Sequence, residues 1–171
     1  NKTVPVIIVN KNATAERQRF TALHELGHLL LNFAQELQDK ERERLCNIFA
    51  NEMLIPTSEF IRLIGVSRKD ISLQELIPIQ IQFGISIDAL MYKAKEASII
   101  TEQRYKGYCI KKNSSSDFNE QIKETRYPQE QSHRFLGLVY KAISQEIISI
   151  SKASSLLNCS VNEVRSSLNF I

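Results

Sequence analysis

Apolar and polar positions along the chain predict one short strand followed by several helices. Residues 4–9 are mostly β-branched and end in a polar turn, which predicts a strand, and Pro5 near its start is typical of an edge strand. From about residue 15 to about residue 33, apolar residues recur every three or four positions, which predicts an amphipathic helix. Its expected buried stripe consists of Phe20, Leu23, Gly27, Leu30 and Leu31.

Two further helices are predicted directly after this one. The first runs from about residue 39 to residue 55, where Pro56 ends it, and a shorter helix covers residues 57–64. The helical pattern fades later in the chain. Residues 101–127 have strand or loop character and include a run of serines typical of a flexible linker.

A helix-turn-helix pattern occurs twice. Residues 70–97 contain two apolar-periodic segments, with Gly84 at the turn and Ser86 as the cap of the second helix. The same pattern returns at residues 150–164, after a helix predicted over about residues 130–146. Acidic residues early in the second helix of each pair oppose the phosphate field of DNA, so packing or partner recognition is favoured over direct DNA binding.

The chemistry-bearing motif is His-Glu-x-x-His within the first predicted helix. Residues four apart share one helix face, so His24 and His28 point the same way and can hold one zinc ion. Glu25 lies about 100° around the helix from His24, where a general base beside the metal must stand. The alternative is an amphipathic helix that carries these three side chains by chance.

A catalytic zinc ion needs a third protein ligand and one open position. The second predicted helix offers Glu41, Glu43 and Glu52. We select Glu43, because it shares a helix face with small residues that allow close approach to another helix. Asn47, one turn later on that face, can accept the free ring N–H of a ligating histidine. The alternative for Glu43 is a solvated charge paired with a neighbouring arginine.

These segments resemble the ImmA/IrrE family of zinc metallopeptidases. The resemblance covers about the first third of the chain, and many members carry Ala where this chain has Cys46. The matching stretches are Val6-Ile7-Ile8-Val9-Asn10, Glu16-Arg17-Gln18-Arg19-Phe20-Thr21, His24-Glu25-Leu26-Gly27-His28, Glu43-Arg44-Leu45-Cys46-Asn47-Ile48-Phe49-Ala50 and Leu54-Ile55-Pro56. The resemblance implies a gluzincin-like domain, with two histidines and one glutamate on zinc.

The expected fold class is therefore α+β and mainly helical. It would consist of a zincin-like core, in which a small sheet with an edge strand accompanies the motif helix and the third-ligand helix, followed by helix-turn-helix-like segments. We expect the metallopeptidase core at residues 1–100, a linker or loop region at 101–127 and a C-terminal helical segment at 128–171. One Zn²⁺ per chain is expected, with Mn²⁺ and Fe²⁺ as alternatives.

Composition bears on whether this domain binds nucleic acid, spans a membrane or lies in a reducing compartment. The chain has 171 residues, 43% of them hydrophobic, and a net charge of +3, which is too small to argue for nucleic acid by itself. No apolar run is long enough to span a membrane. Three widely spaced cysteines form no disulfide or zinc-ribbon pattern, which favours a cytoplasmic location. The chain begins at Asn1 rather than Met, as expected of a fragment of a longer protein.

The sequence therefore predicts a zinc-dependent endopeptidase, with Glu25 as general base and His24, His28 and Glu43 on the metal. Tyr92, Tyr105, Tyr108, His133 or an arginine can supply a further donor to the oxyanion, and the sequence does not choose among them. The family resemblance implies that the substrate is a helix-turn-helix repressor, whose cleavage derepresses its genes. The rival hypothesis is a non-catalytic regulatory protein, similar to a toxin–antitoxin component, that binds DNA or a partner on a protease scaffold.

Overall fold

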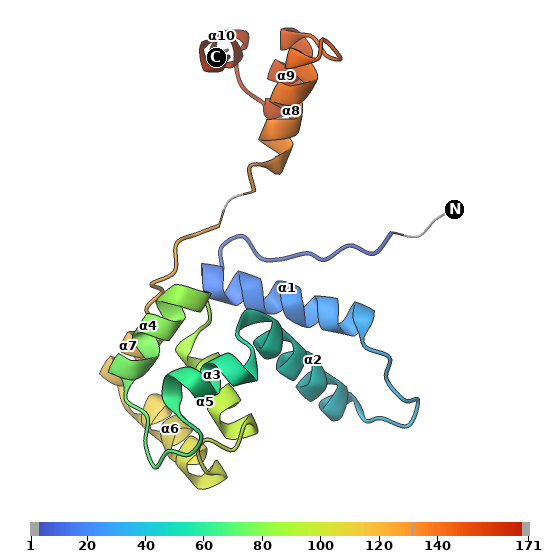
Figure 1. Cartoon of the computed structure of the whole chain (residues 1–171). Coiled ribbons are helices and arrows are strands. Elements are labelled where there is room, and N and C mark those ends of the chain that lie inside the picture. The colour runs from blue at the N-terminus through green and yellow to red at the C-terminus, as the bar shows by residue number, and fades with distance from the viewer. Residues whose placement is uncertain (1–3, 131, 169–171) are drawn as a thin grey trace. The chain divides into compact units, whose positions relative to one another are not determined.

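The computed structural model describes residues 4–130 and 132–168, which contain ten helices and no strand (Figure 1). They fall into two compact units, Asn1–Gln129 and Glu130–Ile171. The first unit holds α1 (Ala15–Leu30), α2 (Asp39–Leu54), α3 (Thr57–Ile64), α4 (Leu73–Phe83), α5 (Ile87–Glu96), α6 (Glu102–Ser114) and α7 (Ser116–Lys123). The second unit holds α8 (Arg134–Ser144), α9 (Ile150–Leu157) and α10 (Val161–Ser167). None of these helices has the length and apolar character needed to cross a membrane.

The predicted α+β class, with its zincin-like sheet and edge strand, is wrong for this chain, because the described residues are all helical. Residues 4–10 are irregular, and Val4, Val6 and Ile8 are 74%, 77% and 86% exposed. A strand persists only when a neighbour pairs with its backbone N–H and C=O groups, and the described part of the chain supplies no such neighbour. The β-strand propensity of residues 4–10 is therefore not enough to form a sheet.

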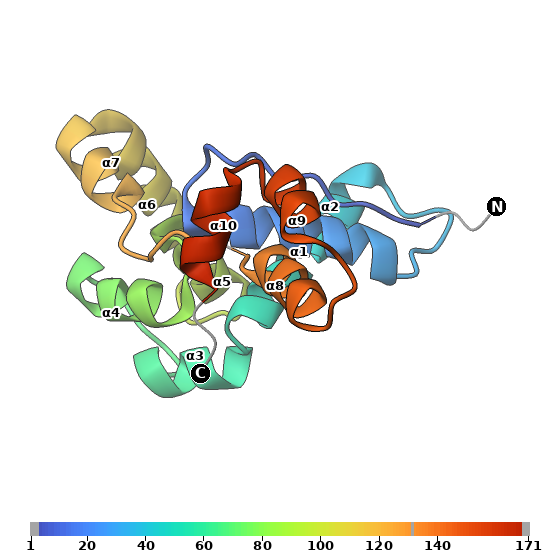
Figure 2. The ribbon, with the colours of Figure 1, turned by 90° about the horizontal axis from the view of Figure 1, so that it is seen from above.

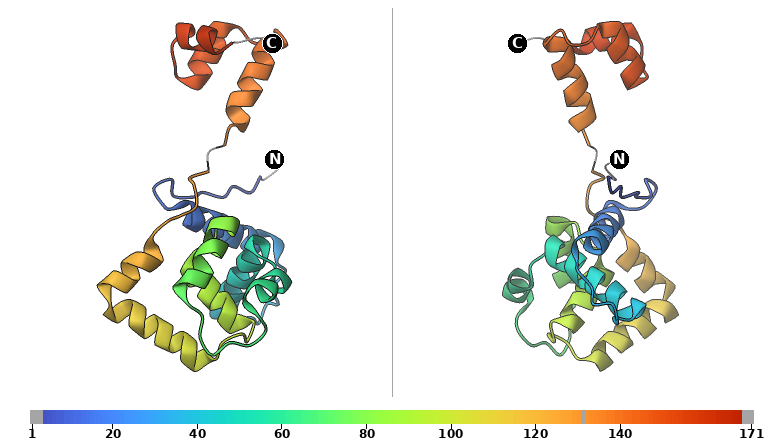
Figure 3. Two further views of the ribbon diagram at one scale, coloured as in Figure 1. Left: turned by 60° about the vertical axis from the view of Figure 1, so that its left-hand side comes forward. Right: turned by 90° about the vertical axis from the view of Figure 1, so that its right-hand side faces the viewer.

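Residues 101–127, where the sequence pattern indicated strand or loop character, are largely helical. Thr101 accepts a hydrogen bond from the backbone N–H of Arg104 and caps α6. Ser115 does the same for Phe118 and begins α7 directly after α6 ends (Figure 3). Within the run of serines that suggested a linker, Ser115 therefore acts as a helix cap, which is the other common use of this residue type.

α1 and α2 lie side by side and run in opposite directions (Figures 1 and 2). Thr14 caps α1 by accepting a hydrogen bond from the N–H of Arg17, and Pro56 follows the end of α2. Gly27 allows the close approach that the sequence suggested: a Cβ there would lie 3.2 Å from Phe49 Cδ1 and 3.4 Å from Cys46 Cα. The expected stripe of α1 is only partly buried, because Leu30 is 60% exposed.

The helix-turn-helix pattern at residues 70–97 forms α4 and α5, as predicted. Gly84 adopts the left-handed conformation at φ 59°, and Ser86 caps α5 through the N–H of Ala89. α5 is mostly a core helix, with five buried residues: Ile87, Leu90, Met91, Lys93 and Ala94. Half of the residues of α5 are therefore committed to the core of the first unit.

The second unit repeats this local design. Asn158 takes the left-handed conformation between α9 and α10, and Ser160 forms a capping box with Glu163. Val139, Ala153 and Val164 form its small core. α8 is shorter than the predicted helix over residues 130–146.

Candidate metal centre

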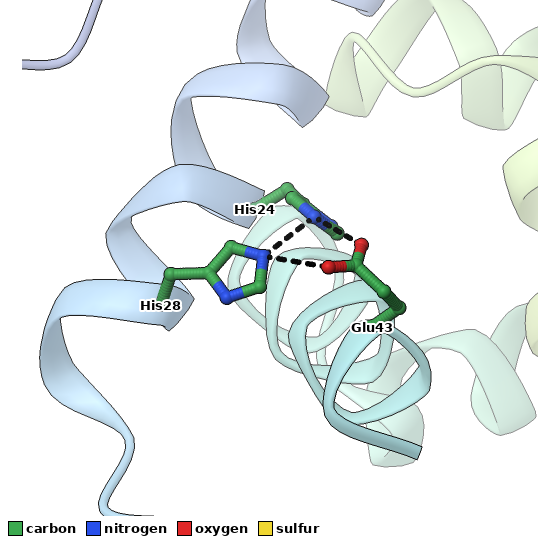
Figure 4. Close-up of side chains that lie close together, drawn as sticks. All are labelled: His24, His28 and Glu43. Carbon is green, nitrogen blue, oxygen red and sulfur yellow. Dashed lines mark hydrogen bonds and ion pairs between the residues drawn. The ribbon is translucent and has the colours of Figure 1, made fainter. Parts of the chain in front are cut away.

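His24 and His28 of α1 and Glu43 of α2 point toward one another (Figure 4). The Nε2 atoms of the two histidines are 3.1 Å apart. One Glu43 oxygen lies 3.1 Å from Nε2 of His24 and the other lies 3.3 Å from Nε2 of His28. Three sequence-predicted ligands from two helices therefore meet at one point.

These distances fit a tetrahedral metal site. Zinc–nitrogen and zinc–oxygen bonds of about 2.0–2.2 Å place neighbouring ligand atoms of a tetrahedron about 3.3–3.6 Å apart. The ligand atoms of His24, His28 and Glu43 all lie within 4.8 Å of one another. Two imidazoles and one carboxylate are also a donor set that suits zinc or another first-row divalent ion. The residues present therefore fit a bound metal ion.

Asn47 orients His24. Its side-chain oxygen lies 2.9 Å from Nδ1 of His24, so Nδ1 donates the hydrogen bond and Nε2 keeps its lone pair toward the cluster. Phe20, one turn before His24 on α1, stacks on the imidazole ring of His24 with ring centroids 6.4 Å apart. The predicted contact between Asn47 and a candidate metal-binding histidine is thus present, and the ring of Phe20 also packs on His24.

The two other carboxylates considered as ligands are engaged elsewhere. Glu41 accepts a hydrogen bond of 2.7 Å from Arg44. Glu52 accepts hydrogen bonds from Thr57 and a 2.8 Å bond from the buried ammonium of Lys93. Of the three candidates on α2, only Glu43 faces the histidines, because it alone lies on the helix face turned toward α1.

Glu25 follows His24 on α1 and is exposed, outside the three-residue cluster. Cys46 of α2 is fully buried and lies against Gly27 of α1. Burial first, and then the negative charges of Glu43 and Glu25, raise the pKa of the Cys46 thiol. Cys46 therefore stays protonated and behaves as a small core residue rather than as a ligand.

A cavity of about 490 Å³ lies in the first unit, with lining residues from α1, α2, α4, α5 and α7. Phe20 and Asn47, which both contact His24, are among its lining residues. Glu16, Gln80 and Asn51 contribute side chains to its walls and are only 2%, 2% and 3% exposed. The cavity is therefore partly polar and reaches two residues that contact His24.

Glu16 is a buried carboxylate held by several donors. It accepts hydrogen bonds from the Thr125 hydroxyl at 2.6 Å, from Gln80 Nε2 at 3.1 Å and from the backbone N–H of Arg126 at 3.2 Å. Burial raises its pKa, but the Thr125 hydrogen bond and the backbone hydrogen bonds outweigh it, so the net pKa lies below the usual value. Glu16 is therefore ionised at neutral pH.

The sequence reading did not identify Phe20, Asn51 or the cavity as parts of the site. One signal was available: Glu43, Asn47 and Asn51 are spaced four apart and so form one line on α2. Residues of other helices that line the same cavity, such as Gln80 of α4, could be identified only from the tertiary structure.

Comparison with known proteins identifies a family for this chain. Residues 1–95, more than half of the chain, match the Peptidase_M78 family model, described as the IrrE N-terminal-like domain. No curated protein and no solved structure matches the chain.

Proposed function

The chain belongs to the Peptidase_M78 family of IrrE N-terminal-like domains, and from this we propose that it is a zinc-dependent endopeptidase. The observation that carries the proposal is the convergence of His24, His28 and Glu43, with ligand atoms 3.1–3.3 Å apart. A zinc ion held by these residues would supply Lewis acidity, polarising a peptide carbonyl and lowering the pKa of water toward about 7.

The side chains of the protein would bind the metal, orient its ligands and transfer protons. His24 and His28 would hold the metal through ring nitrogens, and the carboxylate of Glu43 would offset part of its charge. Asn47 fixes the orientation of His24 by accepting its Nδ1 proton. Glu25 accepts the proton of the attacking water on a carboxylate oxygen and later delivers it to the nitrogen of the leaving amine. Its exposed position leaves it accessible to water and substrate.

The substrate we propose is a helix-turn-helix transcriptional repressor, cut at one site so that its genes are derepressed. This rests on the resemblance to the ImmA/IrrE family, in agreement with the family match. The three cysteines are free, which fits a reducing compartment such as the cytoplasm. Zinc suits the donor set, and manganese and iron are the alternatives.

The test compares wild-type protein with Glu25→Gln, both loaded with zinc and incubated with the repressor encoded nearest to the gene. We expect one discrete cut by wild type and none by Glu25→Gln, with equal zinc content in the two proteins. Glu36→Gln is the matched control, since Glu36 is also exposed but lies outside both α1 and α2. Cleavage by zinc-loaded Glu25→Gln would remove Glu25 as the general base. No cleavage by wild type would favour the non-catalytic binding protein.

A further inference from the structure

The cavity of the first unit has the size and the lining of a small-molecule site. Its volume of about 490 Å³ lies within the range of about 300–1,000 Å³ that is typical of ligand pockets. Phe20, Ala89 and Ile122 give it apolar walls. None of the three candidate metal ligands lines it, so the proposed metal chemistry does not account for this cavity.

The two carboxylates in the lining already have hydrogen-bond donors. Both oxygens of Asp88 accept, Oδ1 from the Tyr108 hydroxyl at 2.7 Å and Oδ2 from the Lys112 ammonium at 2.6 Å. Both oxygens of Glu16 also accept, one from the Thr125 hydroxyl and the other from neutral N–H groups. The acceptors of the cavity are therefore satisfied by the protein itself, and a ligand that brings donors gains little.

The donors of the lining, by contrast, are unused. The mouth of the cavity is formed by its exposed lining residues, which include Arg17 and Lys123. Within the described residues, neither of these side chains makes a hydrogen bond or an ion pair. The side-chain N–H₂ group of Asn47 also donates no hydrogen bond there, since its contact with His24 uses the oxygen. Unused donors beside satisfied acceptors favour a ligand that brings acceptors.

Two helices begin at this cavity and make its surroundings more favourable to negative charge. Thr14 caps α1 and Ser86 caps α5, and both residues line the cavity. The backbone N–H groups in the first turn of a helix carry partial positive charge, which attracts an anion placed near them. This effect acts in the same direction as the charges of Arg17 and Lys123.

We propose that this cavity binds a small organic anion, whose apolar body lies against Phe20 and whose carboxylate or phosphate group pairs with Arg17 and Lys123 at the mouth. A guanidinium group forms paired hydrogen bonds with either kind of oxyanion. Because both cations are exposed, each contributes modestly, and the affinity depends on their combination with burial of the apolar body. This binding function is separate from the proposed peptidase chemistry and needs no metal.

The test is a calorimetric titration with 4-phenylbutyrate and with 4-phenylbutyramide, which has the same shape but no charge. We expect the acid to bind about fivefold more tightly than the amide. Arg17→Met and Lys123→Met should each weaken binding of the acid about threefold and leave binding of the amide unchanged. A parallel titration with 3-phenylpropyl phosphate shows which oxyanion is preferred. Equal binding of the charged and uncharged compounds, or no binding of any of the three, overturns the proposal.

Two further variants separate a site in the cavity from a general effect of charge. Lys69→Met is the matched control, because Lys69 is also exposed but does not line the cavity, and it should leave binding of the acid unchanged. Ala89→Leu adds volume inside the cavity and should weaken binding of all three compounds. Circular dichroism checks that each variant is folded. An equal loss in Lys69→Met and Arg17→Met, or unchanged binding by a folded Ala89→Leu protein, contradicts the proposed site.

Binding in the cavity must also be distinguished from binding to a metal ion, whose open position can accept an oxyanion. The titration is therefore run on zinc-loaded wild type and on Glu43→Ala, and we expect the same affinity for 4-phenylbutyrate in both. Loss of binding in Glu43→Ala would place the anion on the metal and overturn the proposal. Anion binding by a wild-type protein that takes up no zinc would support the cavity site and contradict only the proposed peptidase function.

Discussion

The Nδ1 atom of His24 donates a hydrogen bond of 2.9 Å to the side-chain oxygen of Asn47. This contact joins α1 to α2 one turn away from the point where Glu43 meets both histidines. It fixes the tautomer of His24, because Nδ1 must carry the proton, and leaves Nε2 free toward the metal site. The packing of α1 against α2 therefore also determines how His24 is oriented toward the candidate metal site.

Replacing Asn47 should weaken metal binding without removing a ligand. Asn47→Leu leaves the Nδ1 proton of His24 unpaired and its ring free to rotate, so we expect zinc affinity to fall about 10- to 100-fold. Asn47→Asp retains an acceptor and should bind zinc at least as tightly as wild type. Competition with a chromophoric chelator measures both affinities. Equal loss in the two variants would mean that Asn47 acts through packing and not through its acceptor oxygen.

The identity of the third ligand can be tested by metal content. We expect about one zinc ion per wild-type chain, none retained by Glu43→Ala after dialysis, and a wild-type amount in Glu41→Ala. Glu41 is the matched control, since it lies on α2 and pairs with Arg44 instead of the histidines. Glu52→Ala should also keep zinc. Mass spectrometry of the purified proteins gives the ratios, and zinc lost from Glu41→Ala but kept by Glu43→Ala would reverse the assignment.

Local signals in the sequence were sufficient for most of the helices. The turn at Gly84 and the cap at Ser86 need only neighbouring residues, and both are formed as predicted. The caps at Thr14 and Ser160 are equally local. The sheet was mispredicted because a strand depends on a distant partner. The β-branched residues 4–9 have the propensity for a strand, but the described chain offers nothing for them to pair with.

The convergence of the ligands could be anticipated because it follows from helix periodicity. His24 and His28 share a face of α1, and Glu43 and Asn47 share a face of α2, so one contact between these faces brings all four together. The cavity could not be anticipated in this way. Its lining combines Asn51 of α2 with Gln80 of α4 and Ile122 of α7, and sequence spacing carries no information about which helices meet there.

Gly27 should be required for the close packing of α1 against α2, which carry the candidate metal ligands. A larger side chain there meets the ring of Phe49 and the backbone of Cys46, so Gly27→Leu should cost about 1–3 kcal/mol of stability and lower zinc affinity at least tenfold. Gly107→Leu is the matched control in α6, where the nearest atom is the flexible end of Arg104 at 3.5 Å. Thermal unfolding and chelator competition measure the two effects. Unchanged zinc affinity in a folded Gly27→Leu protein would show that the helix spacing tolerates the added volume.

The buried carboxylate of Glu16 should make the first unit sensitive to acid. Its folded-state pKa lies below the value of 4.5 taken for a free side chain, because the donors around it outweigh its burial. A group with a depressed folded pKa stabilises the fold above its unfolded pKa and loses that contribution as the pH falls through the folded pKa. We therefore expect the stability of the first unit to decline as the pH is lowered below about 4.5.

Glu16→Gln should remove much of this acid dependence. The variant should be about 2 kcal/mol less stable than wild type at pH 7, because hydrogen bonds to a charged acceptor are lost, and the difference should shrink as the pH approaches 3. A residual slope is expected, since the Ser72 backbone N–H and Arg68 lower the pKa of Glu75 to about 2. Denaturant unfolding at a series of pH values measures the curve, with the exposed Glu36→Gln as control. A stability difference between Glu16→Gln and wild type that is the same at pH 7 and pH 3 would mean that the charge of Glu16 is not what holds residues 125–127 to α1.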